Sequence, residues 1–580
     1  MGAAYGMIVP MAMHIDIVPN RKSPPAILLR QSYREGKKVI KRTLANLSSL
    51  PMDQVMAIRR ILKGEQLAPA EEIFQVVRSR HHGHVHAVLE TMKQLGFQKL
   101  LNSRSSRERD LVVAMVASRI LAPHSKLATT RWWHDTSLPG LLGVGDASED
   151  DLYGAMDWLL ERQGPIEKKL AARHLDNDSV MLYDLTSSYF EGKTCPLAAR
   201  GHNRDGKRGK LQVNYGLLAD RRGCPVAVQV FEGNTGDTKT LLPQLYKVKE
   251  QFGIERLVLV GDRGMISQKQ IDVLKKEEGV EWVTALRTET LRKMIEDRSI
   301  RPELFDERNL FEFMHPDYPG ERMIACRNPF LARKREYKRQ DLIEATIREL
   351  EKVQGMAGRG RLKGRDKIGV RVGKVINKYK VGKHFDLDIS DGEFSFSVNE
   401  ERVATEAAMD GIYVVRTSVP ETTMDAPEAV RTYKGLSQVE QAFRTMKGVD
   451  LLVRPIHHRI EDRVRAHIFL CMLAYYVHWH MLQAWRPILF ADDDLDLKVG
   501  RDPVAPVQPS PSAKRKASRK KLDDDTTVHS FRTLLHSLST IVQNECCSPG
   551  ASEDTPTFQV TTTPTLEQQR ALDLLQSIAV

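Results

Sequence analysis

Residues 179–192 read SVMLYDLTSSYFEG, and this stretch decides the fold. Apolar residues precede Asp184, as in a short buried strand, where an unpaired carboxylate would cost several kcal/mol. A strand-end aspartate that accepts backbone hydrogen bonds is the ordinary explanation of such a residue. A carboxylate that belongs to a catalytic or metal site is the alternative, and the rest of the sequence decides between the two.

The segments after this strand alternate between strand and helix patterns. Residues 210–234 carry two alternating runs around a turn, which predicts two further strands side by side. Helix patterns at 238–253 and 267–279 alternate with strand patterns at 256–262 and 282–287. This order predicts an α/β fold with an RNase H-like core, a mixed five-stranded sheet with helices. A doubly wound nucleotide-binding fold also alternates, but it needs a glycine-rich loop after its first strand, and LTSSYFEG is not one.

Periodicity and composition divide the chain into seven segments. We expect a basic N-terminal hairpin and helix region (1–84), a mainly helical N-terminal domain that could bind DNA (85–175), the first part of the core (176–289), a basic, β-rich insertion (290–425), the second part of the core with the helix of Glu440 (426–490), a disordered linker (491–528) and C-terminal helices (529–580).

The insertion contains an unusually basic run, MAGRGRLKGRDKIGVRVGKVINKYKVGKH at 356–384. It carries ten Lys and Arg residues against a single acid, Asp366. Alternation along the run predicts a basic β-ribbon that contacts phosphates, and a solvated surface is the ordinary alternative.

Composition narrows the classes of protein to which the chain can belong. It has 580 residues and a net charge of +12, which favours a polyanionic partner. Six cysteines are scattered without a Cys-x-x-Cys pair, which argues against a zinc site or a disulfide framework. The longest apolar run, IFLCMLAYYV at 468–477, is about half the length that spans a bilayer. We therefore expect a buried core helix there and no membrane partner.

Three acidic residues stand out by their positions in the predicted elements. Asp184 lies on the first core strand, Asp262 ends the strand at 256–262, and Glu440 lies on a later helix. The first and fourth strands of an RNase H-like sheet are neighbours, so the two aspartates converge, and a helix across the sheet can add the glutamate. Two divalent cations would neutralise such a cluster and stabilise both oxygens of a phosphodiester exchange.

The helix of Glu440 is predicted at about 433–447, YKGLSQVEQAFRTMK. Tyr433, Glu440 and Lys447 are seven residues apart, so each is displaced by only about 20° around the axis. All three therefore share one face with Leu436 and Arg444. A surface pair between Glu440 and Arg444, worth a few tenths of a kcal/mol, is the ordinary alternative.

Several of these motifs together resemble the DDE transposases of the IS4 superfamily, and most closely the IS1634-type insertion-sequence transposases. The resemblance rests on YDLTSSYFEG, FEGNTGDTKTL, LVLVGDRGMIS and the run that begins YKGLSQVEQAFRTMK, and it extends from RQSYREGKKVIKRTLANL to PTLEQQRALDLL. It implies that Asp184, Asp262 and Glu440 bind Mg²⁺ or Mn²⁺ and catalyse DNA cleavage and strand transfer. It also implies that the N-terminal region and the insertion hold transposon-end DNA, with a homodimer on that DNA and a cytoplasmic, nucleoid-associated location.

The family pattern around the glutamate is Tyr, Arg, Glu and Lys at fixed spacing. Tyr433, Glu440 and Lys447 match it, but Leu436 stands at the arginine position. Arg444 or Lys434 could supply the missing phosphate contact, so the predicted DNA-binding residues are Tyr433, Arg444 and Lys447. Two other functions stay open at this point: a catalytically silent DNA-binding protein, and an RNase H-like nuclease that cuts without strand transfer.

Overall fold

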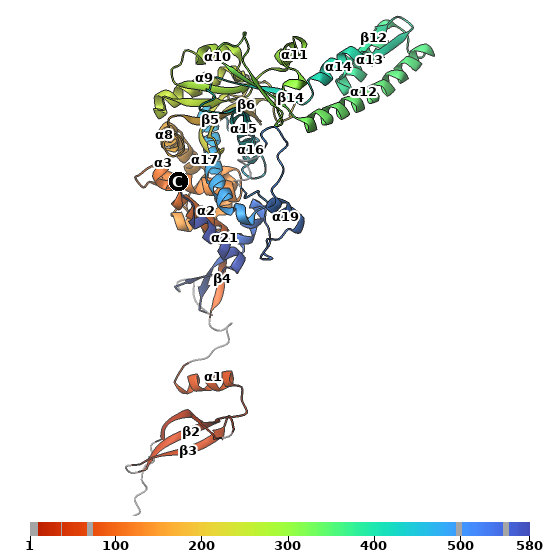
Figure 1. Ribbon diagram of the computed structural model, residues 1–580. Coiled ribbons are helices and arrows are strands. Elements are labelled where there is room, and N and C mark those ends of the chain that lie inside the picture. Colours follow the sequence, from red (N-terminus) through yellow and green to blue (C-terminus); the bar gives the residue numbers. More distant parts are fainter. Residues whose placement is uncertain are drawn as a thin grey trace, which may run out of the picture. The chain divides into compact units, whose positions relative to one another are not determined.

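The computed structural model describes residues 10–21, 23–35, 38–65, 74–494, 502–548 and 556–579. The chain forms two compact units. The first unit comprises Met1–Ser79 with Gln543–Thr562, and the second comprises Arg80–Val542 with Thr563–Val580. Figure 1 labels many of the helices and strands of both units, and each unit is described by itself.

The first unit contains two small sheets and a helix. The first sheet is antiparallel, with β1 (Pro10–Val18), β2 (Ala26–Glu35) and β3 (Lys38–Asn46), and the second sheet contains β4 (Gln75–His81), β15 (Val542–Cys547) and β16 (Phe558–Thr561). Helix α1 (Met52–Leu62) buries Val55 against Ile15 and Ile27 of the first sheet. Strands β2 and β3 pair from Leu28 to Glu35, so the predicted basic hairpin is present.

The second unit begins with the helical domain that the sequence predicts. Its helices are α2 (Gly83–Gln94), α3 (Phe97–Leu101), α4 (Arg107–Leu121), α5 (Lys126–Trp133), α6 (Leu138–Leu142), α7 (Glu149–Glu161) and α8 (Gln163–His174). The hydroxyl of Ser106 accepts a hydrogen bond from the Arg109 N–H and caps α4, which is buried from Leu111 onward. Helix α17 (Glu461–Trp485) packs against α4, α7 and β7, and its burial confirms the core helix predicted at 468–477.

A mixed eight-stranded sheet forms the centre of the second unit. Its strands are β5 (Ser179–Tyr189), β6 (Gln212–Asp220), β7 (Pro225–Glu232), β8 (Leu257–Val260), β9 (Val280–Ala285), β10 (Leu310–Phe313), β11 (Arg322–Arg327) and β14 (Ile412–Thr417). The strand order is β10-β11-β14-β9-β8-β5-β6-β7. The sequence predicted only five strands, because the three added strands lie in the insertion and pair onto the open edge of β9.

Helices on either side of the sheet complete the core. They are α9 (Leu241–Tyr246), followed by a π-helical turn (Lys247–Phe252), α10 (Gln268–Leu274), α15 (Ala426–Lys434) and α16 (Leu436–Lys447). Helix α16 packs against β5, and α15 packs against β9 and β14.

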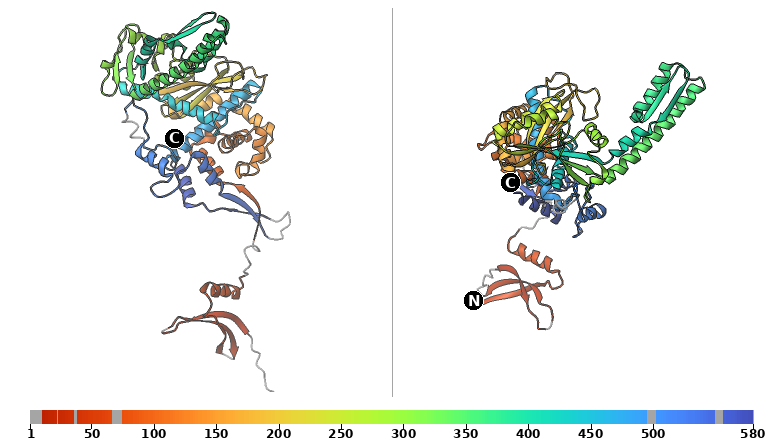
Figure 2. Two further views of the ribbon diagram at one scale, coloured as in Figure 1. Left: turned by 90° about the vertical axis from the view of Figure 1, so that its right-hand side faces the viewer. Right: turned by 45° about the horizontal axis from the view of Figure 1, so that its top comes forward.

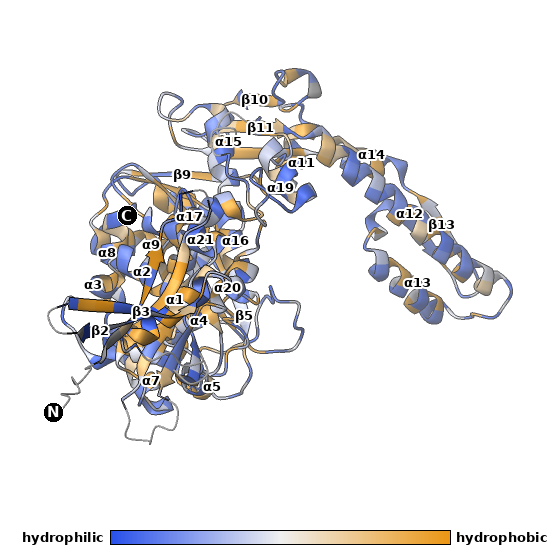
Figure 3. Cartoon of the chain, turned by 90° about the horizontal axis from the view of Figure 1, so that it is seen from below, coloured by the Kyte–Doolittle hydropathy of each residue, from blue (hydrophilic) through white to orange (hydrophobic). Residues whose placement is uncertain are grey.

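The insertion is mainly helical, so the β-rich prediction was wrong. Its elements are α11 (Thr288–Glu296), α12 (Pro329–Gly358), α13 (Arg365–Tyr379), the hairpin β12 (Phe385–Ile389) and β13 (Phe394–Val398), and α14 (Glu400–Ala408), besides the sheet strands. Figure 2 shows α12 and α13 running side by side, and we call the segment from α12 to α14 the arm. Figure 3 shows hydrophilic residues along much of α12 and α13.

The basic run at 356–384 forms the end of α12 and α13 rather than a ribbon. Burial explains the difference. Ile368, Val372 and Val375 are buried at helical spacing in the apolar core of the arm. Val370, which a strand would place on the same face as Ile368 and Val372, is 62% exposed.

The segment 491–528 is not disordered where the structure describes it. Residues 495–501 lie outside the described residues, whereas 502–528 include α19 (Pro511–Arg519). Lys516 on α19 is buried and pairs with Asp493 at 3.0 Å, and the Val504 carbonyl accepts a hydrogen bond from Asn328 Nδ2. These contacts join segments that are far apart in the sequence. Composition does not reveal such contacts, and composition alone therefore predicted disorder. The predicted C-terminal helices are α20 (Phe531–Ser539) and α21 (Leu566–Gln576), accompanied by the strands β15 and β16.

Among the described residues no single helix is both long and apolar enough to cross a membrane. Helices α4 and α5, bent by 91° at the break between them, meet the criteria of length and composition only as a pair.

Candidate active site

Two of the predicted acids lie at the same level on neighbouring strands. Strands β5 and β8 are parallel, and Leu182 pairs with Val260 at the end of their register. Asp184 and Asp262 each follow that pair by two residues. Alternation along β5 places the Asp184 carboxylate on the face of Leu182, and the charge of Asp262, just beyond the end of β8, acts on it. The parallel pairing thus brings the two aspartates together.

Asp184 sits in an environment that disfavours its ionised form. The Leu185 N–H donates a hydrogen bond of 2.8 Å to its Oδ1. Burial raises the pKa of Asp184 from its ordinary value of 3.8 to about 7. The charges of Asp262 and Glu440 contribute to this rise, and the Leu185 hydrogen bond and Arg204 oppose it. The three carboxylates are therefore within electrostatic reach of one another.

Asp262 is held by the turn that follows β8. The N–H groups of Gly264 and Met265 donate hydrogen bonds of 3.0 and 2.8 Å to its Oδ1. A Cβ added at Gly264 would lie 3.4 Å from the same oxygen. The turn fixes the carboxylate in one orientation relative to β5, as a metal ligand requires.

Glu440 lies on α16, which packs against β5, and its side chain is 63% exposed. Its carboxylate is 3.6 Å from the Arg444 guanidinium, four residues along the helix. The predicted single helix at 433–447 is broken at Gly435, where α15 ends and α16 begins. Gly435 keeps right-handed helical dihedral angles (φ −55°, ψ −25°). The helical periodicity of the sequence therefore continues across Gly435 and does not reveal the break.

Tyr433, at the end of α15, lies close to all three acids. Burial raises its pKa to about 12, and the next largest cause is the charge of Asp262, with smaller effects of Glu440 and Asp184. The structure therefore brings together Asp184, Asp262, Glu440 and Tyr433, four of the residues that sequence reasoning selected. Three carboxylates supply the hard oxygen ligands that Mg²⁺ and Mn²⁺ prefer, so the donor set fits such cations.

Comparison with known families identifies the chain. Residues 177–477 match the model of the transposase DDE domain, and residues 15–73 match the model of the IS1634 family transposase N-terminal domain. The chain belongs to the DDE transposases of the IS1634 type. It is thus the transposase of an insertion sequence, an enzyme that cleaves DNA and transfers strands.

No curated protein matches the transposase. Among solved structures, it is similar to the piggyBac transposase in a cryo-EM structure of its synaptic complex with hairpin DNA. The identity is 10% and the TM-score 0.32, over 78% of this chain and 77% of that one.

The structure places Lys447 of the transposase in a buried ion pair. Its Nζ donates a hydrogen bond of 3.0 Å to Asp205 Oδ1, and its side chain is only 9% exposed. Arg454 pairs with the same carboxylate, and the Tyr189 N–H donates to Asp205 Oδ2 at 2.9 Å. Lys447 therefore lies beside the predicted site, bound to Asp205 rather than directed at the three acids.

Sequence reasoning missed the residues of the loop between β5 and β6. Arg204 lies near Asp184 and pairs with Asp237 at 2.6 Å. Asp205 joins Lys447 to Arg454. The loop HNRDGKRG at 202–209 has neither helical nor strand periodicity, so no local signal shows which way its charges point.

The two cations that could replace the missing family arginine differ in their surroundings. Leu436 is buried among core residues, and the Lys434 ammonium donates a hydrogen bond to the Val504 carbonyl at 3.3 Å. Arg444 is 67% exposed and close to Glu440, so it is the cation of this helix best placed to meet a phosphate.

A second group of metal-ligand side chains lies far apart in the sequence, where no spacing could reveal it. His174, Cys224 and His480 each place a ligand atom within 4.8 Å of the others. Arg222 lies 3.3 Å from His174 Nδ1, and His174 Nε2 lies 3.1 Å from the Tyr476 hydroxyl. The three side chains therefore pack together with Tyr476 and Arg222 beside them.

The raised pKa of Asp184 predicts a gain in stability for Asp184→Asn. Because the folded pKa lies above the unfolded value of 3.8, the ionised carboxylate costs stability from about pH 4 upward, and the full cost is present above pH 7. Asp184→Asn should raise the melting temperature by a few degrees at pH 8 and leave it unchanged below pH 4. The exposed Asp178, paired with Arg256 at 2.7 Å, is the control, and Asp178→Asn should bring no such gain. A variant no more stable than wild type at pH 8 would contradict the burial of an ionised Asp184 beside the other acids.

The buried pair at Asp205 predicts the opposite effect. Asp205→Asn leaves Lys447 and Arg454 without their shared carboxylate, which should lower the free energy of unfolding by about 3–5 kcal/mol. Lys210→Gln, which removes an exposed pair with Glu191, should cost at most about 1 kcal/mol. Urea unfolding of both variants measures the difference, and equal losses would show that the buried pair contributes no more than a surface one.

Proposed function

We propose that Asp184, Asp262 and Glu440 hold divalent cations, Mg²⁺ or Mn²⁺, and catalyse both DNA cleavage and strand transfer. The observation that carries this proposal is the register of β5 and β8, which sets both aspartates two residues beyond a paired position. The charges of Asp262 and Glu440 raise the pKa of Asp184, and this supports the proposal. Bound cations would stabilise the ionised forms of such neighbouring carboxylates.

The strands that carry this site are arranged as an RNase H-like core. Strands β7, β6, β5, β8 and β9 are consecutive in the sheet, with β6 antiparallel to β5 and β8 parallel to it. The first strand thus lies at the centre and carries Asp184, and the fourth strand lies beside it and precedes Asp262. Helix α16 packs against the central strand and adds Glu440.

The residues divide the work of phosphodiester exchange. When bound, the cations supply the positive charge that activates water and stabilises the attacking and leaving oxygens. The turn at Gly264 keeps Asp262 in place, and the exposed Glu440 closes the site from the solvent side. Cleavage of a strand at the end of the element releases a 3′-OH. That hydroxyl then attacks a phosphate of target DNA, with loss of the target's own 3′-oxygen as the leaving group.

Cations around the carboxylates hold the DNA backbone. Arg444 contacts a phosphate near the scissile bond, and Tyr433 flanks the strand. Lys447 and Arg454 share the single charge of Asp205, so this group keeps a net positive charge beside the site. The N-terminal unit and the arm bind transposon-end DNA, and all ten basic residues at 359–383 are exposed. A second copy of the chain joins on the bound DNA, and the reaction takes place in the cytoplasm at the nucleoid.

The first prediction of this proposal concerns the acids. Asp184→Asn and Glu440→Gln should each lower Mg²⁺-dependent cleavage of DNA that carries the element's terminal inverted repeats by at least about a hundredfold. Binding of the same DNA should change little, because neither residue is a cation. Glu428→Gln on α15, which removes a pair with Arg431, is the control and should retain activity. Cleavage at the wild-type rate in either variant would sink the assignment.

Arg444 gives a second, narrower test. Arg444→Ala should reduce cleavage about tenfold or more while leaving the melting temperature within a degree or two, since an exposed helix arginine contributes little to stability. Gln441→Ala, also exposed on α16, controls for the loss of a polar side chain. Full activity of Arg444→Ala, or a loss explained by unfolding, would make Arg444 a surface residue only.

The arm predicts the salt dependence of DNA binding. Replacing Arg359, Arg361, Lys363 and Lys367 with Gln should flatten the log-log plot of affinity against salt by about 0.9 for each phosphate that the variant no longer neutralises. Circular dichroism checks that the arm remains helical in the variant. An unchanged slope would leave these residues as a solvated surface.

A further inference from the structure

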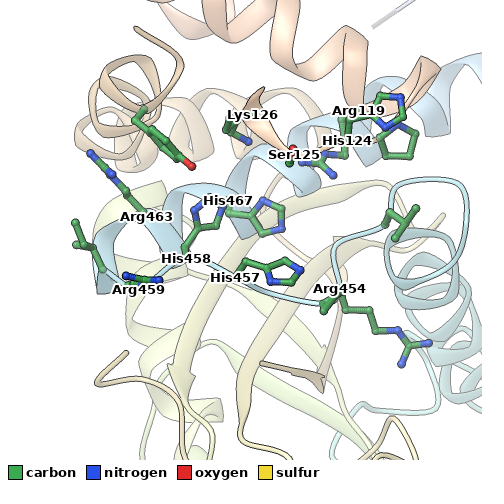
Figure 4. Close-up of a pocket in the computed structure, with 15 residues that line it drawn as sticks. Arg119, His124, Ser125, Lys126, Arg454, His457, His458, Arg459, Arg463 and His467 are labelled. Carbon is green, nitrogen blue, oxygen red and sulfur yellow. The ribbon is translucent and has the colours of Figure 1, made fainter. Parts of the chain in front are cut away.

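A strongly cationic cavity of about 620 Å³ lies in the second unit, between the helical domain and the segment that leads into α17. Figure 4 shows its lining residues. Five of them carry positive charge, namely Arg119, Lys126, Arg454, Arg459 and Arg463. Four histidines also line it, and no aspartate or glutamate stands among the described residues of the lining. The volume lies within the range of about 300–1,000 Å³ that is usual for ligand sites.

Two of the cations are buried and lack partners. Arg119, near the end of α4, is 8% exposed, and Lys126, the first residue of α5, is 6% exposed. Within the described part of the chain, neither side chain has a hydrogen-bond acceptor or an ion-pair partner. Buried cations are normally paired, because removing an uncompensated charge from water is costly. Burial, helped by the charge of Arg119, lowers the pKa of Lys126 to about 7.

The cavity adjoins the cationic side of the candidate active site. Arg454 lines the cavity and pairs with Asp205, the carboxylate that also binds Lys447. Lys447 follows Glu440 by seven residues on α16, a rise of about 10 Å along the helix. Lys447 and Arg454, which share Asp205, therefore connect the helix of Glu440 to the cavity that Lys126 lines.

We propose that this cavity binds a backbone phosphate of a DNA strand, together with its adjoining nucleotide, a few nucleotides from the scissile phosphate. Arg119 and Lys126 bind the phosphate, and the exposed ring of His457 at the cavity wall offers a face on which a base can stack. This inference rests on the proposed function, because the carboxylates place the scissile phosphate. An inorganic phosphate ion has the same charge chemistry, so the test separates the two sources.

The test compares Lys126→Met with wild type in the full-length protein. The probe is a fluorescein-labelled oligothymidylate of about 12 nucleotides, and a chelator removes divalent cations. Lys126→Met should bind at least about tenfold more weakly, and the log-log salt slope should fall by about 0.7 because one phosphate is no longer neutralised. The melting temperature of the free variant should stay level or rise, because a buried unpaired charge is gone. Lys168→Met, an exposed residue of α8, is the matched control and should bind as wild type does.

Two further experiments test the proposal. Should Lys126→Met fold poorly, Arg459→Gln replaces it, because Arg459 is exposed at the cavity and its loss should weaken binding about threefold. Equal affinity of the folded Lys126 variant and wild type overturns the proposal. Stabilisation of wild type by inorganic phosphate, with unchanged oligothymidylate binding in the variant, also overturns it and makes the cavity a site for the free ion.

The outcome is independent of the carboxylate assignment. Because the binding assay contains no divalent cation and the variant loses no positive charge, Asp184→Asn should bind oligothymidylate at least as tightly as wild type does. Failure of the proposed function would appear as cleavage that survives Glu440→Gln, whereas failure of the cavity proposal would appear only in the binding of the Lys126 and Arg459 variants.

Discussion

The parallel pairing of β5 with β8 is the constraint on which the rest of the site depends. It sets Leu182 opposite Val260, and therefore Asp184 at the level of Asp262, before any side-chain contact is considered. The neighbouring elements orient these two aspartates or bring further charged side chains close to them. The turn at Gly264 orients Asp262, α16 packs on β5 and adds Glu440, and the loop between β5 and β6 brings Arg204 toward Asp184. A one-residue shift of this register would turn one of the two aspartates to the other face of the sheet.

Two clusters of opposite charge lie near this pair of strands. The three acids form a negative cluster in which Asp184 resists ionisation, and the cations of the neighbouring cavity form a positive one that contains Arg119 and Lys126. Between them, Asp205 joins Lys447 and Arg454 in a buried group with one carboxylate for two cations. A protein stable in isolation has little reason to keep either cluster, because each one costs folding free energy. Both are expected in an enzyme that binds cations and a polyanion together.

The sequence predicted the parts of this arrangement that local periodicity encodes. The alternation around Asp184 and the strand before Asp262 indicated adjacent core strands, and helical spacing placed Glu440 on a face beside them. Periodicity did not predict the structure of segments that fit both a strand and a helix pattern, or of loops that fit neither. In the arm, Ile368 and Val372 fit a strand as well as a helix, and only the exposure of Val370 separates the two. Arg204, Asp205 and Arg454 lie in loops, and the order of 502–528 comes from distant contacts such as that of Val504 with Asn328.

The two charged clusters have a joint consequence for assembly. Cations bound by Asp184, Asp262 and Glu440 would remove the negative field that repels a DNA strand, and a strand held at Arg119 and Lys126 would place its phosphates where they share those cations. Each ligand then lowers the cost of binding the other. By linkage, the factor by which divalent cations strengthen DNA binding must equal the factor by which DNA strengthens cation binding. The residues between the two sites, Lys447, Asp205 and Arg454, are the physical connection, because they lie against both the helix of Glu440 and the cationic cavity.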